Sequence, residues 1–353
     1  MNILITGIAG FVGSRLARYL LAARSDLKIW GIDNLSRRGS EQNLAAVREI
    51  GCEFIHGDVR CPSDLEALPP MHWVIDAAAN PSVLAGLNGN AGSLVGHNLI
   101  GSLNLLEKCR RDSAGFVLIS SSRVYSIDAL NSLPLSKAST RYELSDGTCS
   151  APGVGSQGVR EEFSTAAPVS LYGATKLASE IMALEYGSTF SLPIWINRCG
   201  VIAGAGQFGK IDQGIFSYWI HSYRERSPLQ LVGYGGTGLQ VRDCLHPDDL
   251  ARLVSAQLDA GGSADRPRIC NVSGGLASSM SLHELNAWCA ERFGSHAVGS
   301  RPETRTLDAP WVVLDAGLAK RTWGWRPQMS VHAILDEIAE HADAHPDWLR
   351  QCS

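Results

Sequence analysis

The sequence predicts an α/β protein with a doubly wound parallel sheet and a smaller C-terminal α/β lobe. Short apolar segments alternate with helical patterns through most of the chain, which is typical of a parallel sheet covered by helices on both faces. A glycine-rich turn at 7–13 follows the first apolar segment and leads into a helical pattern. A tyrosine and a lysine four residues apart, Tyr172 and Lys176, lie on one face of a later predicted helix.

The elements follow in order along the chain. Apolar segments predict strands at 2–6, 28–32, 53–56, 73–79, 116–120, 192–197 and 268–272, with short ones at 229–232 and 238–241. Helical periodicity predicts helices at 14–23, 98–109, 174–186, 215–223, 281–293 and 331–341, and one that begins near Leu250. Residues 126–169 have little periodicity, and about 44 residues are too many for a passive connection, so we expect a lid or a substrate-facing insertion.

Composition excludes several classes of function. Among 353 residues, 35 acidic side chains exceed 31 basic ones, which argues against a nucleic-acid partner. We expect no membrane span, because no apolar run reaches the roughly 18 residues that a span requires. The N-terminus carries no secretory signal pattern. The nine cysteines are scattered and form no C-x-x-C pair, which predicts reduced thiols in the cytoplasm, with neither a disulfide framework nor a metal site.

The glycine-rich turn predicts a dinucleotide site. Gly7 permits a tight turn, Gly10 lets a pyrophosphate approach the backbone, and Gly13 allows close packing of helix on strand. The N-terminus of the helix then faces the phosphates. The spacing is G-x-x-G-x-x-G, where the better-known fingerprint is G-x-G-x-x-G.

The second strand ends at Asp33, whose carboxylate can accept hydrogen bonds from ribose hydroxyls and would repel a 2′-phosphate. This favours NAD over NADP, although Arg37 and Arg38 leave NADP open. Asp58, after the third strand, is expected to meet the adenine, with a solvated loop carboxylate as the alternative. Small residues at 77–79 would let the cofactor lie against the backbone.

Tyr172 and Lys176 predict general base chemistry. A phenol with a pKa of about 10 is a poor base at neutral pH, and a neighbouring ammonium favours the phenolate. The tyrosine could then take a proton from a substrate hydroxyl while the lysine reaches the cofactor ribose. The polar run from Ser120 to Arg123 ends the fifth strand, at the edge of a parallel sheet where ligands bind.

Together these motifs resemble the extended short-chain dehydrogenases/reductases, a Rossmann-fold family that includes nucleotide-sugar epimerases and dehydratases. The motifs are Gly7/Gly10/Gly13, Asp33-Asn34-Leu35, Gly57-Asp58, Asn98 with Asn104-Leu105-Leu106-Glu107, the serines before Val124-Tyr125, Tyr172/Lys176 and Arg242-Asp243. The resemblance implies bound NAD and a nucleotide-diphosphate sugar as substrate, CDP- or UDP-linked. It also implies a homodimer or higher homo-oligomer.

The resemblance assigns roles to individual residues. It implies Tyr172 as base, Lys176 as its partner and Ser121 as the residue that binds the reacting hydroxyl. It implies that Arg242 and Arg305 clamp the diphosphate, although both could be salt-bridge partners instead. The cofactor-binding set is Gly7, Gly10, Phe11, Val12, Gly13, Asp33, Asn34, Ser36, Asp58, Val59, Ala77, Ala78, Ala79, Asn98, Ser120, Tyr172 and Lys176, and the substrate-binding set is Ser121, Ser122, Arg123, Gln207, Gln213, Arg242 and Arg305.

The resemblance also implies a division of the chain. Residues 1–197, with the insertion 126–169, form the NAD-binding Rossmann domain, which 237–262 completes. Residues 198–236 and 263–353 form the nucleotide-sugar lobe.

Within the family, several segments are similar to 2-epimerases of CDP-linked sugars, which implies inversion at C2 of a CDP-linked hexose or deoxyhexose through a keto intermediate. These segments are 33–37, 140–142, 207–208, 212–214 and 240–246. Alternatives are a UDP-sugar 4-epimerase, a net nucleotide-sugar oxidoreductase and a redox-sensing NAD-binding protein.

Three departures from the family pattern bear on the choice. Ser126 replaces a glycine. Val201 stands where 4-epimerases have asparagine, and Ser122 and Arg123 stand where dehydratases have Asp-Glu.

Overall fold

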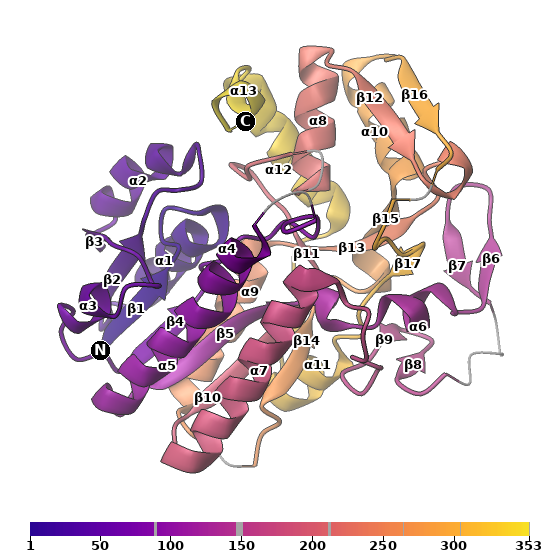
Figure 1. Cartoon of the computed structure of the whole chain (residues 1–353). Coiled ribbons are helices and arrows are strands. Elements are labelled where there is room, and N and C mark those ends of the chain that lie inside the picture. The colour runs from indigo at the N-terminus through magenta and orange to yellow at the C-terminus, as the bar shows by residue number, and fades with distance from the viewer. Residues whose placement is uncertain (88–89, 146–150, 211–212, 264, 304, 353) are drawn as a thin grey trace.

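A computed structural model describes the chain except for residues 88–89, 146–150, 211–212, 264, 304 and 353 (Figure 1). Its centre is a seven-stranded parallel sheet in the order β14-β10-β5-β4-β1-β2-β3, which confirms the predicted doubly wound fold. The strands are β1 (Asn2–Thr6), β2 (Lys28–Asp33), β3 (Glu53–His56), β4 (Trp73–Asp76), β5 (Gly115–Ser121), β10 (Ile194–Cys199) and β14 (Ile269–Val272).

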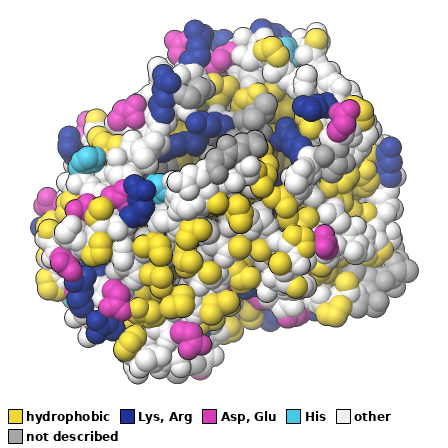
Figure 2. Space-filling view, in the orientation of Figure 1, with side chains coloured by type: hydrophobic (Ala, Val, Ile, Leu, Met, Phe, Trp, Pro, Cys, Tyr) yellow, Lys and Arg dark blue, Asp and Glu magenta, His cyan; other side chains and the backbone are white. Residues whose placement is uncertain are grey.

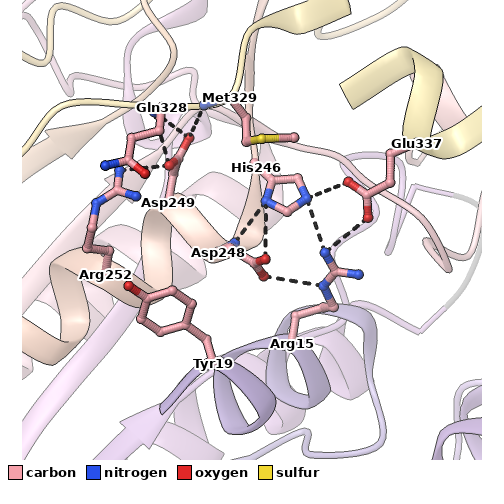
Figure 3. A pocket seen from close by; sticks show the side chains of 9 residues that line it. All are labelled: Arg15, Tyr19, His246, Asp248, Asp249, Arg252, Gln328, Met329 and Glu337. Carbon is pink, nitrogen blue, oxygen red and sulfur yellow. Dashed lines mark hydrogen bonds and ion pairs between the residues drawn. The ribbon is translucent and has the colours of Figure 1, made fainter. Parts of the chain in front are cut away.

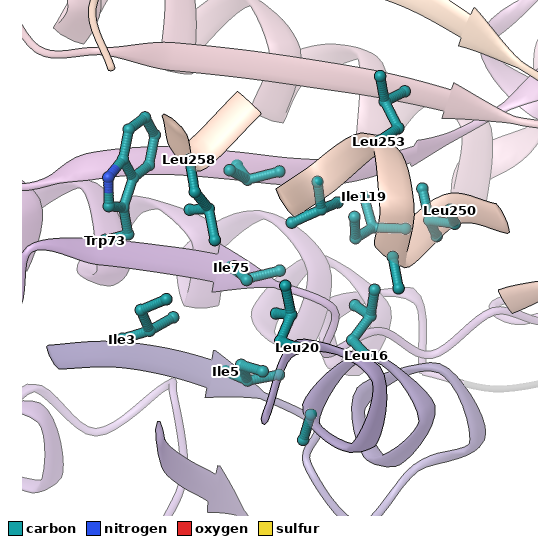
Figure 4. Packing of buried hydrophobic residues seen from close by; sticks show 14 of the residues in the cluster. Ile3, Ile5, Leu16, Leu20, Trp73, Ile75, Ile119, Leu250, Leu253 and Leu258 are labelled. Carbon is teal, nitrogen blue, oxygen red and sulfur yellow. The ribbon is translucent and has the colours of Figure 1, made fainter. Parts of the chain in front are cut away.

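Helices cover both faces of this sheet. On one face α1 (Phe11–Ala23) and α9 (Pro247–Ala260) pack side by side, with α2 (Leu44–Glu49) and α11 (Gly317–Trp323) at the edges. Figure 4 shows leucines of α1 and α9 against Ile3, Ile5 and Ile75 of the sheet. On the other face lie α3 (Pro62–Glu66), α5 (Gly101–Asp112) and α7 (Ser170–Phe190). Helices exclude water from both faces of the sheet, so apolar side chains are buried on both sides and the central strands show almost no alternation between buried and exposed residues.

The second part of the molecule has its own apolar core. It contains α8 (Ile215–Glu225), α10 (Leu282–Phe293), α12 (Val331–Ala344) and α13 (Trp348–Cys352). A small sheet joins β11 (Val201–Ile202), β13 (Val241–Leu245), β15 (Ser279–Ser281) and β17 (Trp311–Val312), and β12 (Leu229–Val232) pairs with β16 (Val298–Arg301).

The structure corrects three predicted elements. The predicted strand at 73–79 ends at Asp76, because the next two backbone N–H groups turn to the Thr6 hydroxyl. The helix predicted at 98–109 is preceded by α4 (Ala91–Val95) and a π-helical turn (Gly96–Ile100), and α5 follows. The strand predicted at 238–241 begins only at Val241, since Gly238 has a left-handed φ of 73°.

The predicted division into a cofactor domain and a sugar lobe stays a prediction, but two strands shift its boundaries. The prediction assigned Ile269–Val272 to the sugar lobe. In the structure this strand pairs in parallel with β10 at the edge of the large sheet. Conversely, β13 lies within 237–262 and belongs to the small sheet.

The insertion 126–169 is bound to the second part of the molecule. It holds α6 (Ile127–Asn131) and two short hairpins, β6–β7 (Leu135–Lys137 and Tyr142–Leu144) and β8–β9 (Val154–Gly155 and Gly158–Val159). Arg141 forms an ion pair of 2.5 Å with Glu284 on α10. The Val159 N–H donates to the Val313 carbonyl at 2.9 Å. The described residues of this insertion therefore brace the second part of the molecule.

Two further findings concern composition. Among the described residues, no helix combines the length and apolarity that a membrane crossing requires. The eight cysteines that the structure describes are all free, Cys149 lies outside the described residues, and the cytoplasmic location stays a prediction.

Candidate active site

The glycine-rich turn has the close contacts that its sequence predicts. A Cβ on Gly7, whose φ is 63°, would lie 3.0 Å from the Ala78 Cα, and a Cβ on Gly13 would lie 2.2 Å from the Gly7 carbonyl oxygen. Gly10 caps α1 without a side chain, so the N–H groups of the first turn, at Phe11 and Val12, have no side-chain cap. The turn is thus a cradle of free donors at a helix N-terminus, which fits a dinucleotide pyrophosphate.

Asp33 is fixed beside this cradle. Its two carboxylate oxygens accept hydrogen bonds from the Ala9 N–H at 3.0 Å and the Leu35 N–H at 2.8 Å. Burial raises the pKa of Asp33, and these backbone hydrogen bonds offset only part of that rise. Arg37, which left NADP open, donates instead to Gln213 at 2.7 Å and to the Phe208 carbonyl at 3.0 Å.

The residues predicted near the adenosine form a connected group. Asn34 donates to the Asp58 carboxylate at 2.9 Å and accepts from the Ser36 N–H at 3.0 Å. Hydrogen bonds from Arg60 lower the pKa of Asp58, which is ion-paired with that arginine at 2.6 Å. Val59 is buried next to them.

Thr6, which the sequence analysis did not select, holds the backbone of the predicted cofactor segment 77–79. Its hydroxyl accepts from the N–H groups of Ala77 and Ala78 at 3.1 and 2.9 Å and donates to buried Asp76 at 3.0 Å. This shapes the loop that continues through Ala79. The available signal was a polar residue at the carboxyl end of each of two neighbouring strands.

Asn98, on the π-helical turn, connects that loop to the helix of Tyr172. Its side chain accepts from the Asn80 N–H at 2.8 Å and donates to the Thr175 hydroxyl at 3.2 Å. Thr175 in turn donates to the Tyr172 carbonyl at 2.8 Å. Asn98 therefore acts through its neighbours, by positioning the first turns of α7.

Tyr172 and Ser121 meet where α7 begins and β5 ends. The pKa of the Tyr172 phenol is raised by burial, and a hydrogen bond from Ser121 and the charge of Arg123 offset part of that rise. A Cβ on Gly173 would lie 2.2 Å from the Arg123 carbonyl oxygen, so the backbone after Ser121 lies directly against the backbone after Tyr172. The structure thus brings together Ser121, Arg123 and Tyr172, and Ser122 is buried between them in the chain.

Lys176 lies one turn beyond Tyr172 and is only 2% exposed. Burial lowers the pKa of its ammonium, whereas Asp76, Cys199 and Glu180 raise it. Within the described part of the chain its ammonium makes no hydrogen bond or ion pair, which fits a ligand such as a ribose.

The Ser120 side chain belongs to a buried polar network and not to the Tyr172–Ser121 centre. Its hydroxyl donates to Glu180 at 2.5 Å, and Glu180 forms a buried ion pair of 2.7 Å with Arg198. The structure therefore gives the Ser120 side chain a partner within the protein. A cofactor contact of this residue stays a prediction.

A cleft of about 620 Å³ opens beside Arg123 between the two parts of the molecule. Figure 2 shows Lys and Arg side chains around this hollow. Four of the predicted substrate residues line it: Arg123, Gln213, Arg242 and Arg305. Gln207 instead donates to the Ile202 carbonyl at 2.6 Å, and Asp212, part of the resemblance, lies outside the described residues.

Arg242 lines this cleft and is also a salt-bridge partner. It pairs with Asp308 at 2.6 Å and donates to the Ala309 carbonyl at 2.8 Å. Aromatic and aliphatic side chains cover much of the cleft wall, among them Val83, Leu84, Val201, Ile215, Phe216, Tyr218, Trp219, Val232, Met280, Leu282 and Leu285.

A second hollow, of about 550 Å³, lies between α1, α9 and α12 (Figure 3). Its charged groups are largely paired with one another. Glu337 binds Arg15 at 3.0 Å and His246 at 2.7 Å, and Arg15 also lies 3.4 Å from Asp248. This network joins the two parts of the molecule, and none of the predicted site residues lines it.

The fold and this site define an NAD-binding α/β protein with a Ser–Tyr–Lys centre beside a basic cleft. The family model described as "NAD dependent epimerase/dehydratase family" matches residues 3–273. The chain belongs to this family, and its cofactor is NAD.

The chain is similar over nearly its whole length to several characterised proteins. It is 31% identical to a CDP-paratose 2-epimerase of Salmonella typhi, over 94% of this chain and 96% of that protein. It is 26% identical to a UDP-glucuronate 4-epimerase of Thermodesulfobacterium geofontis, over 94% and 93%. Its structure resembles the Thermus thermophilus UDP-glucose 4-epimerase complex with NAD, with a TM-score of 0.77, 25% identity and coverage of 97% and 99%. The protein is therefore an NAD-dependent nucleotide-sugar enzyme.

Proposed function

We propose that the protein is an NAD-dependent nucleotide-sugar epimerase that inverts C2 of a CDP-linked hexose or deoxyhexose through a keto intermediate. The observation that carries this proposal is a centre with one phenol base, Tyr172, next to Ser121 and an arginine. NAD, when bound, supplies a hydride acceptor that can return the same hydrogen to the sugar.

The residues of the chain handle the hydroxyl proton. Ser121 donates a hydrogen bond to the phenol oxygen, which favours the phenolate and orients the reacting hydroxyl. The Tyr172 phenolate takes the hydroxyl proton and later gives it back as general acid. Lys176 is buried one helical turn beyond Tyr172 and has no hydrogen bond or ion pair with the described residues, so its ammonium is available to a cofactor ribose.

The ion pairing of the carboxylates in the cleft favours an epimerase over a dehydratase. Elimination of water needs an acid to protonate the leaving hydroxyl. Among the described residues that line the cleft, the carboxylates are Glu303 and Asp308, and both are ion-paired with arginines. The two positions after Ser121 are Ser122 and Arg123, neither of which can act as that acid at neutral pH.

The relative at 31% identity supports a CDP-linked substrate and inversion at C2. The UDP-sugar 4-epimerase alternative has the UDP-glucuronate 4-epimerase relative in its favour. Against it stands Val201, which lines the cleft where the resemblance expects a substrate-binding asparagine. A net oxidoreductase on the same fold would differ from both in releasing reduced cofactor.

One experiment separates these readings. The purified protein is given a panel of CDP- and UDP-linked hexoses in D₂O, and the products are followed by NMR. We expect inversion at C2 of a CDP-linked sugar with no deuterium at that carbon, because Tyr172 exchanges only the hydroxyl proton. Inversion at C4, or steady accumulation of NADH, would support an alternative, and deuterium at C2 would mean that a protein base removes the carbon-bound proton.

The proposal includes a homodimer or higher homo-oligomer, and an apolar face supports it. Six of the seven exposed large apolar residues in the described chain lie on or next to α4, the π-helical turn and α7: Leu87, Val95, Ile100, Leu171, Ile181 and Phe190. Figure 2 shows this face as largely hydrophobic. A face of this kind rarely stays in contact with water.

The oligomeric state can be tested directly. Ile181 is 54% exposed at this face, and Ile181→Glu is expected to lower the mass measured by light scattering or sedimentation to that of one chain. Leu276→Glu is the matched control, because Leu276 is the exposed large apolar residue that lies outside the face in the described part of the chain. An unchanged mass for Ile181→Glu, or a wild-type protein that is already monomeric, would contradict the proposal.

A further inference from the structure

Arg123 stands apart from the other arginines of the cleft. Arg242 is ion-paired with Asp308, and Arg301 is ion-paired with Glu303 at 3.5 Å. The Arg123 guanidinium makes no hydrogen bond or ion pair with any residue that the structure describes. A half-buried charge without a partner is costly, so this guanidinium is expected to have an anionic ligand.

The backbone of Arg123 is locked into the catalytic centre. Its N–H donates to the Ser121 hydroxyl oxygen at 3.2 Å. Its carbonyl oxygen leaves no room for a side chain at Gly173, the residue after the base. The Arg123 side chain therefore starts from backbone that contacts Ser121 and the residue after Tyr172. Its guanidinium lines the cleft, where the charges of Arg242, Asp308 and Tyr172 act on it.

Two sources of phosphate exist in this enzyme. The cofactor pyrophosphate fits the glycine cradle at the start of α1, which is separate from the cleft that Arg123 lines. The diphosphate of the nucleotide sugar fits the cleft, where Arg123 lies within range of the charge of Arg242. The substrate is thus the anion that can reach Arg123.

Sugar chemistry then links Arg123 to the position of the reaction. The β-phosphate is bonded to C1 through one oxygen, so C2 is one bond from the phosphate-bearing carbon, whereas C4 lies across the ring. A cation placed beside the base can hold the phosphate close to the base only if the reacting carbon is near C1.

We infer that Arg123 binds the β-phosphate of the nucleotide sugar next to Tyr172, and thereby selects C2 as the carbon that reacts. This inference rests on the proposed function, because it requires a nucleotide-sugar substrate in this cleft. It makes Arg123 a specificity-determining residue, whose ligand is the one phosphate that a nucleoside monophosphate lacks.

The test measures binding by calorimetry, with CDP and CMP as probes of the NAD-loaded protein. Arg123→Met is expected to weaken CDP binding by about 10- to 100-fold, the usual worth of a hydrogen-bonded charge pair. CMP binding should stay within about twofold, because CMP has no β-phosphate. Arg224→Met is the matched control, since Arg224 is on α8, pairs with Asp343 at 2.9 Å and lies outside the cleft lining.

Each outcome decides the question. Equal losses of affinity for CDP and CMP would mean that Arg123 holds another part of the nucleotide. No loss of affinity for either ligand would mean that Arg123 binds no phosphate. Both outcomes would overturn the inference and leave the proposed function standing. A wild-type protein that binds neither CDP- nor UDP-sugars would overturn the proposed function itself. The melting temperature with NAD shows whether Arg123→Met is folded, and Arg123→Lys, which keeps the charge, should recover part of the CDP affinity.

A second arm tests the position of the reaction with two substrate analogues. A CDP-2-deoxyhexose has no hydroxyl to oxidise at C2, so it should leave the bound cofactor oxidised. A CDP-4-deoxyhexose should still produce the absorbance of bound NADH. The opposite pattern would place the reaction at C4 and overturn the selection of C2.

Discussion

Gly173→Ala tests how closely the base and the end of β5 must approach. An alanine Cβ here would lie 2.2 Å from the Arg123 carbonyl oxygen, and ordinary contact begins near 3.4 Å. The two backbones must therefore move apart by about 1 Å. A misplacement of that size at a catalytic centre costs on the order of 100-fold in rate. Alanine is meanwhile favoured over glycine within a helix by about 1 kcal/mol, which offsets part of the strain.

We therefore expect Gly173→Ala to lose about 100-fold in kcat with a change of only a few degrees in melting temperature. The assay follows epimerisation by NMR and unfolding by calorimetry. Gly187→Ala is the control on the same helix, because its Cβ would meet the Ile194 Cγ1 atom at 2.6 Å, a side-chain atom that can move. Activity of Gly173→Ala within a few-fold of wild type would refute the close approach of Tyr172 and Arg123.

Two other predictions concern the base and the insertion. Tyr172→Phe is expected to lower turnover by about 100- to 10,000-fold with NAD still bound, as measured by kinetics and cofactor content; near-normal turnover would remove Tyr172 from the mechanism. Glu284→Gln should destabilise the fold by about 1–3 kcal/mol at neutral pH, measured by denaturant unfolding. Burial raises the pKa of Glu284, but hydrogen bonds from Arg141 and other donors outweigh it and lower the pKa to about 2. A carboxyl group whose pKa is lower in the folded than in the unfolded protein stabilises the fold at pH values above the unfolded pKa. The difference in stability between Glu284→Gln and wild type should therefore vanish as the pH falls from about 4.5 to about 2. A difference that persists at about pH 2 would contradict the ion pair.

Local patterns predicted the parts of the fold that depend on neighbours in the chain. Gly7 and Gly13 are needed because the turn, the strand and the helix they join are consecutive, so their close contacts follow from spacing alone. The insertion could not be placed in this way. Its position depends on contacts such as Arg141 with Glu284, which are far apart in sequence and leave no periodic pattern.

The candidate site shows the same limit. Tyr172, Lys176 and Ser121 follow from short motifs; the structure places Ser121 against Tyr172 and buries Lys176 one helical turn further along α7. Thr6 was not predicted, because a single threonine at a strand end has no spacing that marks its partner; only the approach of the loop after β4 reveals its role. Whether Arg37 faces a cofactor phosphate could not be decided from sequence for a similar reason, since its partners, Phe208 and Gln213, are far from it in the chain.

Position 123 connects the choice of reaction with the choice of carbon. A carboxylic acid after Ser121 could protonate a leaving hydroxyl and support elimination, whereas a guanidinium keeps its protons at any physiological pH. The burial of Arg123 lowers its pKa, but from a value so high that the side chain remains charged. Burial raises the pKa of Tyr172, and the charge of Arg123 acts against that rise, which favours the phenolate that takes the hydroxyl proton. An arginine at this position therefore removes the acid that dehydration needs and favours the phenolate form of the base that epimerisation needs. Because it can also hold a phosphate beside that base, one side chain accounts for both features of the proposed reaction.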